Sequence, residues 1–238
     1  METITNFFDG VVNSNIFLLT LSIVAYYVAV LINQRIKSLL CHPILVSSLI
    51  VIGVLLLIDV DYQTYNEANE FLYTMLNISV VCLSYLMHKN LGRIKQYRLS
   101  LIVSTFIGSV VGLLSIWGLS LLFGCDEAIM LSLLPKSITS AVAVSLCDVV
   151  GGIPALTVLG VVVAGISGSI IGPRILTLCR VTDPVAVGAA MGSASHAVGT
   201  ARALELGALQ GAVGGAAICL MALFTSLLLP LFLALLPA

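Results

Sequence analysis

Residues 212–236 read AVGGAAICLMALFTSLLLPLFLALL and contain no charged side chain. An α-helix rises about 1.5 Å per residue, so about 20 apolar residues cross the roughly 30 Å hydrocarbon core of a bilayer. The stretch is long enough for such a crossing. It predicts a membrane-spanning helix, and the rest of the chain has to suit the same environment.

The composition of the whole chain agrees with this prediction. Of its 238 residues, 60% are hydrophobic and 9% are charged, whereas a soluble domain carries about 25% charged residues. We therefore expect an all-α, polytopic transmembrane bundle, with residues 1–238 forming a single domain because no polar linker divides them. The formal net charge of −1 provides no basic surface, so no nucleic acid partner is expected.

Further hydrophobic stretches fall into two groups. The nearly uncharged ones have the length of a spanning helix; they are residues 16–32, 39–58, 99–123 and 153–171, with a weaker stretch at 71–87. Two others, residues 128–147 and 185–206, are interrupted by charge, proline or dense glycine and serine. These two are predicted to be irregular or re-entrant segments.

Lysine and arginine predict the orientation, because cytoplasmic loops collect them. Most of the ten lie in three short regions between hydrophobic stretches: residues 35–37, 89–98 and 174–180. We expect these regions in the cytoplasm and the N-terminus outside, in a bacterial cytoplasmic membrane. Both 89–98 and 174–180 are cytoplasmic only if an even number of crossings separates them. A re-entrant hairpin or an unwound helix at 128–147 would satisfy this count; the alternative is that Arg174 and Arg180 violate the rule.

The first interruption contains Pro135 and Lys136. A charge at membrane depth costs roughly 2.5 to 3.5 kcal/mol, so it needs compensation. An anionic substrate would provide it, with Ser137, Thr139 and Ser140 completing the site. In the alternative interpretation, Lys136 pairs with Asp148 or Glu205 or extends to the interface.

The second interruption combines small residues with polar and charged ones. We predict substrate-binding roles for Ser195, His196, Gly199, Thr200 and Arg202. Arg202 and Glu205 are three residues apart and are expected to pair on one helical face. His196 is a candidate proton carrier, with a structural hydrogen bond as the alternative.

Outside the bilayer, Asn66 and Glu67 are candidate gating or coupling residues, as is Glu205 within the second interruption. For Glu67 the alternative is a solvated loop acid. The six cysteines are scattered singly, and no nucleotide fingerprint, metal-ligand spacing or nucleophile–base arrangement occurs. We therefore expect no enzyme, no cofactor and no metal site.

Four motifs resemble the LrgB/CidB family, to which the plant plastid glycolate/glycerate transporter is related. They are TYNE at 64–67, LLPKS at 133–137, GGIPA at 151–155 and ASHAVGTARALELG at 194–207. The resemblance implies passage of small monocarboxylates, often with a small LrgA-type membrane partner. It also implies an older interpretation, a holin/antiholin-like modulator of murein hydrolases and autolysis.

Our leading functional prediction is a secondary transporter of pyruvate, glycolate or glycerate, with proton coupling through His196 as an option. Its two interrupted segments would meet near the middle of the membrane. The comparable halves suggest an inverted repeat, and a homodimer is the favoured oligomer. The alternative is the holin/antiholin-like regulatory or pore-like protein.

Overall fold

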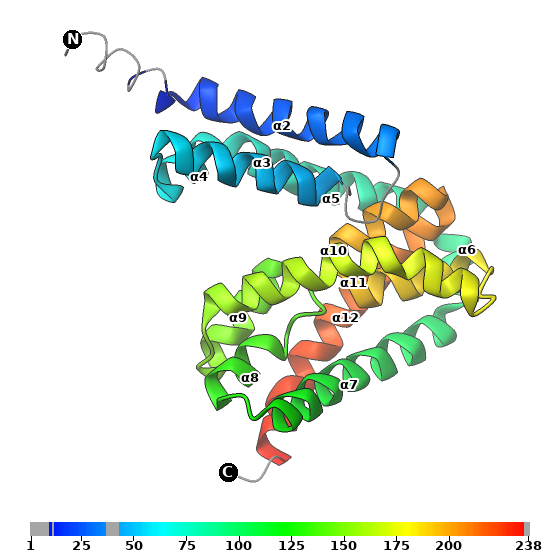
Figure 1. Ribbon diagram of the computed structural model, residues 1–238. Helices are drawn as coiled ribbons and strands as arrows, with labels where there is room; N and C mark the ends of the chain where they lie inside the picture. The colour runs from blue at the N-terminus through cyan, green and yellow to red at the C-terminus, as the bar shows by residue number, and fades with distance from the viewer. Residues whose placement is uncertain (1–9, 11, 37–42, 236–238) are drawn as a thin grey trace, which may run out of the picture. The chain divides into compact units, whose positions relative to one another are not determined.

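The computed structural model of the protein describes residues 10, 12–36 and 43–235, without the side chains of residues 73, 76, 77, 79, 80 and 83. These residues are largely helical and include no strand (Figure 1). Four of the described helices are long and apolar enough to cross a membrane: α2 (Asn15–Ile36), α7 (Arg98–Phe123), α10 (Pro154–Leu178) and α12 (Ala208–Leu235). The prediction of an all-helical membrane protein is confirmed.

The chain divides into two compact units, residues 1–81 and 82–238. In the first unit, α2 packs against α3 (Pro43–Ile58) and α4 (Tyr62–Ala68), and the first part of α5 (Glu70–Lys89) completes the unit. The predicted span at 39–58 begins outside the described residues and is seen from Pro43 onward. The single domain expected from the sequence stays a prediction.

The second unit is built around α7, α10 and α12. Its other described helices are α6 (Leu91–Gln96), α8 (Glu127–Leu133), α9 (Ser140–Val150) and α11 (Pro184–Leu206). Helices α7 and α12 run in parallel, because Phe106 meets Phe224 with ring centroids 5.4 Å apart and Trp117 meets Phe232 at 6.2 Å. Both ring pairs are edge-to-face, an arrangement that aromatic side chains favour.

Helices α8 and α9 form a re-entrant hairpin. α9 has 11 residues and is about 16 Å long, too short to cross a bilayer. Ser132 in α8 contacts the start of α10: its Oγ accepts from the Ile153 N–H at 2.7 Å and its carbonyl accepts from Thr157 Oγ1 at 2.8 Å. Near the end of α9, Cys147 Sγ would lie 2.7 Å from a Cβ at Gly152. Both arms therefore reach the same end of α10.

The sequence explains where this hairpin turns. Residues 134–139 separate the two helices, and Pro135 supplies no N–H to continue α8. Leu134, Pro135 and Ile138 are buried, so the turn lies inside the protein. Irregular backbone at this depth is tolerated because protein surrounds it.

Helix α11 folds back on itself. Ser195 (φ −135°, ψ 19°) and His196 (φ 41°, ψ −132°) leave the helical region and divide it into two halves. A Cβ at Gly188, in the first half, would lie 3.0 Å from the Cα of Gln210. Leu204, in the second half, lies beside Gly211, where an added Cβ would be 3.0 Å from the Leu204 Cα.

A straight helix would place residues 188 and 204 about 24 Å apart, yet both adjoin the start of α12. Such close packing requires small residues, and α12 supplies them in a fully buried run: Gly211, Ala212, Val213, Gly214, Gly215, Ala216 and Ala217. Both interrupted segments are therefore hairpins. α8–α9 lies between the end of α7 and the start of α10, whereas α11 lies at the opposite end of the unit, between α10 and α12 (Figure 1).

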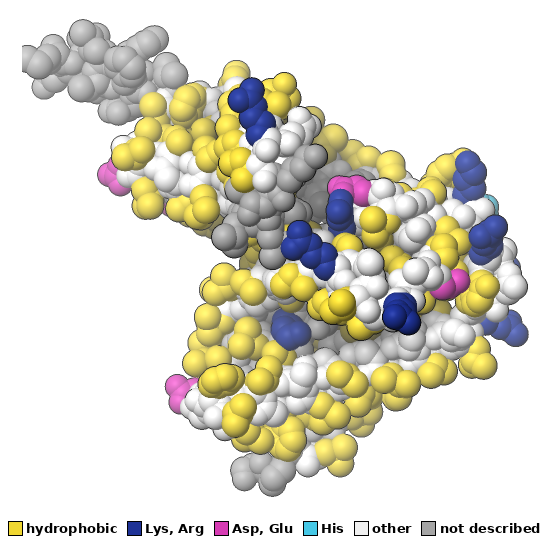
Figure 2. All heavy atoms as spheres, turned by 45° about the vertical axis from the view of Figure 1, so that its right-hand side comes forward, with side chains coloured by type: hydrophobic (Ala, Val, Ile, Leu, Met, Phe, Trp, Pro, Cys, Tyr) yellow, Lys and Arg dark blue, Asp and Glu magenta, His cyan; other side chains and the backbone are white. Residues whose placement is uncertain are grey.

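The outward faces of the long helices remain apolar. Leu122 of α7 is 76% exposed and Leu178 of α10 is 84% exposed. Hydrophobic side chains also cover much of the face shown in Figure 2. Such a surface suits contact with lipid, as expected for a multi-pass membrane protein.

Candidate functional site

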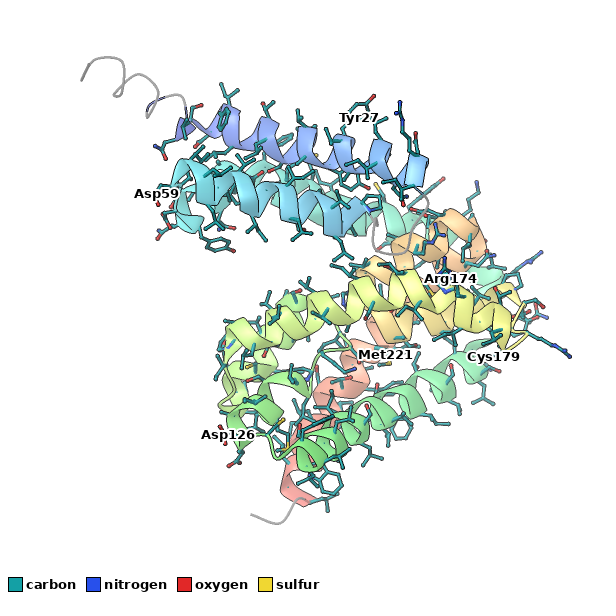
Figure 3. All side chains as sticks on the ribbon, viewed as in Figure 1. Tyr27, Asp59, Asp126, Arg174, Cys179 and Met221 are labelled. Atoms are coloured by element: carbon teal, nitrogen blue, oxygen red, sulfur yellow. The ribbon has the colours of Figure 1, made fainter. Side chains whose placement is uncertain are left out.

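The tips of the two hairpins meet on consecutive residues of α10. At Gly160 an added Cβ would lie 3.7 Å from the Cβ of Lys136, which belongs to the first tip. At Val161 the backbone carbonyl is 2.8 Å from Nε2 of His196, which belongs to the second tip. Met221 of α12 packs at the same level, against Ile138 and Val161 (Figure 3). Both tips therefore lie against the same part of α10, and their meeting near the middle of the membrane stays a prediction.

Lys136 in the first tip is half-buried and points its ammonium group to a neighbouring hydroxyl. Its Nζ is 3.4 Å from Ser137 Oγ, and no carboxylate of a described residue forms a salt bridge with it. The alternative pairing with Asp148 or Glu205 is therefore wrong for the described residues. Thr139 precedes α9 in an extended conformation, and Ser140 begins that helix.

His196 sits in a socket formed by α10. The side chain is 5% exposed, and a Cβ at Gly165 would come within 2.5 Å of its Cε1. A Cβ at Gly168 would overlap Ser195 Oγ. Because a carbonyl only accepts, we assign the proton to Nε2, which leaves Nδ1 as the acceptor in the neutral ring. His196 is thus a buried hydrogen-bond donor that holds the tip on α10.

Gly165 and Gly168 escaped the sequence-based prediction. Isolated glycines in an apolar helix resemble ordinary packing residues. The available signal was the series Gly160, Gly165, Gly168 and Gly172 along one stretch, where three of the four adjoin Lys136, His196 or Ser195. Gly172 adjoins Met191.

The other predicted residues of the second interruption contribute mainly to packing. An added Cβ at Gly199 would clash with the Met191 carbonyl and lie 2.5 Å from the Cβ of Ser195, so Gly199 allows the two halves of α11 to approach. Thr200 is buried against Gly214, and its Oγ1 has no hydrogen-bond partner among the described residues.

Arg202 and Glu205 form the predicted i,i+3 ion pair. Their side chains are 42% and 64% exposed, and Arg202 lies about 9 Å along the helix from His196. No described contact joins Arg202 to either tip. The substrate-binding roles predicted for Lys136, His196, their neighbours and Arg202 stay predictions. The coupling role of Glu205 also stays a prediction.

Asn66 and Glu67 lie in α4 of the first unit, and both are exposed. Glu67 Oε1 accepts from Gln63 Nε2 at 3.4 Å. Asp61 caps α4, and hydrogen bonds from the backbone N–H groups of Gln63 and Thr64 lower the pKa of its carboxyl group. The gating role of Asn66 and Glu67 stays a prediction.

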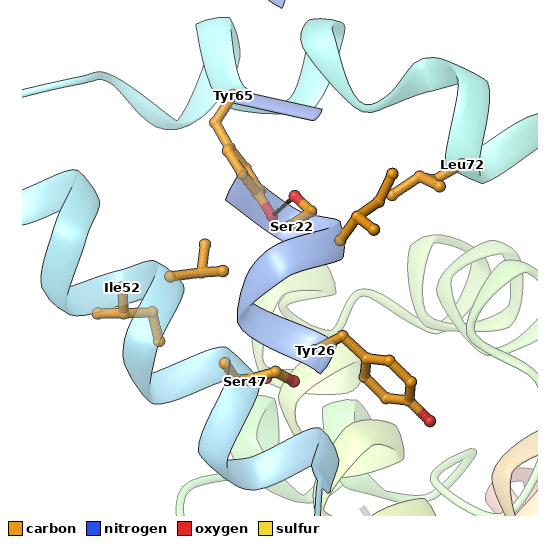
Figure 4. A pocket seen from close by; sticks show the side chains of 9 residues that line it. Ser22, Tyr26, Ser47, Ile52, Tyr65 and Leu72 are labelled. Carbon is orange, nitrogen blue, oxygen red and sulfur yellow. Dashed lines mark hydrogen bonds between the residues drawn. The ribbon is translucent and has the colours of Figure 1, made fainter. Parts of the chain in front are cut away.

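In the TYNE motif at residues 64–67, Tyr65 is the residue whose side chain points toward α2. Its hydroxyl is 2.8 Å from Ser22 Oγ of α2 (Figure 4), and Ser22 Oγ is 2.8 Å from Asn69 Oδ1. No role was predicted for Ser22 or for Tyr65, although Tyr65 belongs to the TYNE motif. No group of histidine, cysteine, aspartate or glutamate in the described part of the chain is arranged to hold a metal ion.

The fold and the paired tips define a multi-pass helical membrane protein with two buried hairpins. The sequence model of the LrgB-like family matches residues 22–235, so the chain belongs to the LrgB-like family. No solved structure matches it significantly.

Curated relatives cover nearly the whole chain. "Holin-like protein CidB" of Staphylococcus epidermidis is 34% identical over 90% of this chain and 94% of its own. "Holin-like protein CidB" of Staphylococcus aureus is 33% identical over 90% of this chain and 93% of its own. The "Uncharacterized protein YxaC" of Bacillus subtilis is 32% identical over 91% of this chain and 94% of its own.

These names correct the leading functional prediction. The relatives are named holin-like, so the monocarboxylate transporter is wrong and the alternative is favoured. The pyruvate, glycolate or glycerate substrate is withdrawn with it, together with substrate coupling to a proton at His196.

Proposed function

We propose that this chain is a holin-like protein of a bacterial cytoplasmic membrane that modulates murein hydrolase activity and autolysis. The observation that carries the proposal is its similarity to the two holin-like relatives over 90% of its length. The protein would act as a regulatory or pore-like membrane component.

The surfaces of the spanning helices support an action within the membrane. Their outward faces carry many exposed leucines, including Leu119 and Leu122 on α7 and Leu159 on α10. Such faces accept lipid, further copies of the chain or other spanning helices. We propose that they support a homo-oligomer, with a dimer favoured, and association with an LrgA-type membrane protein.

Positive charge supports an orientation with the N-terminus outside. Because α8–α9 enters and leaves at one end of the unit, α7 and α10 are the only crossings between Arg98 and Arg174 among the described residues. These arginines then lie on the same side, which positive charge marks as cytoplasmic. The α8–α9 hairpin thereby supports the even number of crossings that the proposed orientation requires.

Autolysis of whole cells tests the proposal. A bacterial strain that lacks its own LrgB-like protein would express this chain or a Gly192→Val variant, in which the added side chain meets the backbone of Gly214. We expect the native chain to change both the lysis rate after detergent exposure and the murein hydrolase activity released, whereas Gly192→Val does not. Membrane fractions would establish that native protein reaches the membrane.

Purified protein in vesicles separates the two modes of action. Release of carboxyfluorescein but not of large dextrans would indicate a pore of limited size, and retention of both dyes would indicate a regulatory component. Native protein that is present in the membrane yet alters neither lysis nor hydrolase activity would contradict the proposal.

A further inference from the structure

The first unit contains a cavity of about 560 Å³ between α2, α3, α4 and α5. This volume lies within the range of about 300 to 1,000 Å³ that small-molecule sites occupy. Neither the candidate site at the hairpin tips nor the proposed function involves it. Figure 4 shows side chains of four helices facing this space.

Hydroxyl groups supply the polar part of the cavity. Those of Ser22 and Tyr65 bond to each other at 2.8 Å, and Ser47 Oγ donates to the Ile44 carbonyl at 3.1 Å. The hydroxyls of Tyr26 and Ser48 form no hydrogen bond with another described residue. The wall therefore offers two free hydroxyls and further acceptor lone pairs to a ligand.

The remaining wall is apolar, and no charged residue contributes to it within the described chain. Val51 is 9% exposed and lies at the buried side, whereas Ile23 and Ile52 are 54% and 53% exposed. An ionised ligand would lose its hydration here without gaining an opposite charge. An uncharged amphiphile would place its polar head against the hydroxyl groups and its apolar chain against the apolar side chains of the wall.

The mouth of the cavity lies along the spanning helix. Ile23 and Tyr26 belong to α2, which is long and apolar enough to cross a membrane, and Tyr26 is 51% exposed. The cavity is therefore open along α2, a helix that suits a position in the bilayer. We propose that this cavity binds an uncharged lipid whose head carries hydroxyl and ester groups, with its acyl chain extending between the helices.

Photolabelling of the full chain tests this inference independently of autolysis. The protein would be reconstituted in phosphatidylcholine vesicles with a monoacylglycerol that carries a diazirine in its chain. The comparison probe is phosphatidylglycerol with the same photoreactive chain, which has hydroxyls and a negative charge. We expect the monoacylglycerol to label peptides of α2 and α3 preferentially, and excess unlabelled monoacylglycerol to compete.

Two pairs of variants provide matched controls. Val51→Phe fills the cavity and should abolish competed labelling, whereas Val111→Phe, at a 56% exposed position of α7, should not. Tyr26→Phe removes one free hydroxyl and should weaken competition by roughly fivefold. Tyr27→Phe should leave it unchanged, because Tyr27 is 63% exposed and does not line the cavity.

Several outcomes would overturn the inference. They are equal labelling by phosphatidylglycerol, labelling that unlabelled monoacylglycerol does not compete, and equal effects of Tyr26→Phe and Tyr27→Phe. The tyrosine pair preserves the volume of the side chain, so it decides the matter even if Val51→Phe fails to elute as a single folded species.

Discussion

At the scale of single residues, the tip of α11 depends on the glycine at position 165, which has no side chain. Gly165 leaves the space that the His196 ring occupies, and His196 in turn adopts a positive φ that few non-glycine residues adopt. The imidazole hydrogen bond to the Val161 carbonyl compensates for this conformation. The socket and the strained residue therefore stabilise each other.

Gly165→Ala should destabilise the protein by about 1 to 3 kcal/mol, because the added methyl group meets the imidazole ring. Thermal unfolding in detergent, followed by circular dichroism, measures the effect. The control is Gly118→Ala, since nothing lies within 4 Å of a Cβ at Gly118. Alanine should be neutral or slightly stabilising there. Equal stability of the two variants would contradict the socket.

Thr200→Val should stabilise the protein by about 1 kcal/mol. The Thr200 hydroxyl is buried without a partner among the described residues, so an apolar group of similar shape removes a desolvation penalty. Thr105→Val is the matched control, because the Thr105 hydroxyl donates to the Leu101 carbonyl at 2.7 Å. It should be neutral or destabilising in the same unfolding measurement. A destabilised Thr200→Val would show that the hydroxyl has a partner.

At the scale of elements, the long apolar helices follow from local sequence. Hydropathy depends on consecutive residues, and it correctly placed α2, α7, α10 and α12. Pro135 and Lys136 likewise marked the first hairpin. The sequence predicted that residues 185–206 are irregular or re-entrant, but it left open whether they fold back, because the fold-back depends on contacts of Gly188 and Leu204 with a helix that follows them. The small residues of 185–206 indicated close helix packing, but they did not indicate that the partner is the start of α12.

Single-cysteine variants test both hairpins through their accessibility. In a chain whose other cysteines are replaced, Cys125 and Val149→Cys should react from one side of the membrane, because α8–α9 begins and ends at the same end of α10. Cys179 and Leu206→Cys should react from the opposite side, because α11 returns to the end where it starts. Impermeant maleimide on intact spheroplasts, before and after lysis, gives the measurement. Reaction of Leu206→Cys together with Cys125 would show that α11 crosses the membrane.

At the scale of the whole molecule, we expect charge and hydropathy together to determine the proposed orientation. The formal net charge is only −1, so the distribution of basic residues matters more than their number. The largest group follows α5 and surrounds α6; it comprises Lys89, Arg93, Lys95 and Arg98. This group should act as the main cytoplasmic anchor.

Replacing these four residues by glutamine should convert one orientation into a mixture of two. The fraction of molecules whose Cys125 reacts from outside should fall, as the same maleimide assay would measure. Arg202→Gln is the control, because Arg202 is already paired with Glu205 and should leave the orientation unchanged. An unaltered Cys125 fraction in the fourfold variant would assign the orientation to other features.

The fold-back of α11 also has a consequence for biosynthesis. Residues 184–206 fall short of the hydropathy of the described spanning helices, and they pack against Gln210, Gly211 and Gly214. A ribosome that has released only the first 206 residues into the translocon has not yet made this partner surface. We therefore expect the hairpin to stay outside the hydrocarbon until α12 emerges, and the two to enter the bilayer together. Insertion of residues 184–235 is thus expected to combine packing of α11 on α12 with the sequential threading of helices.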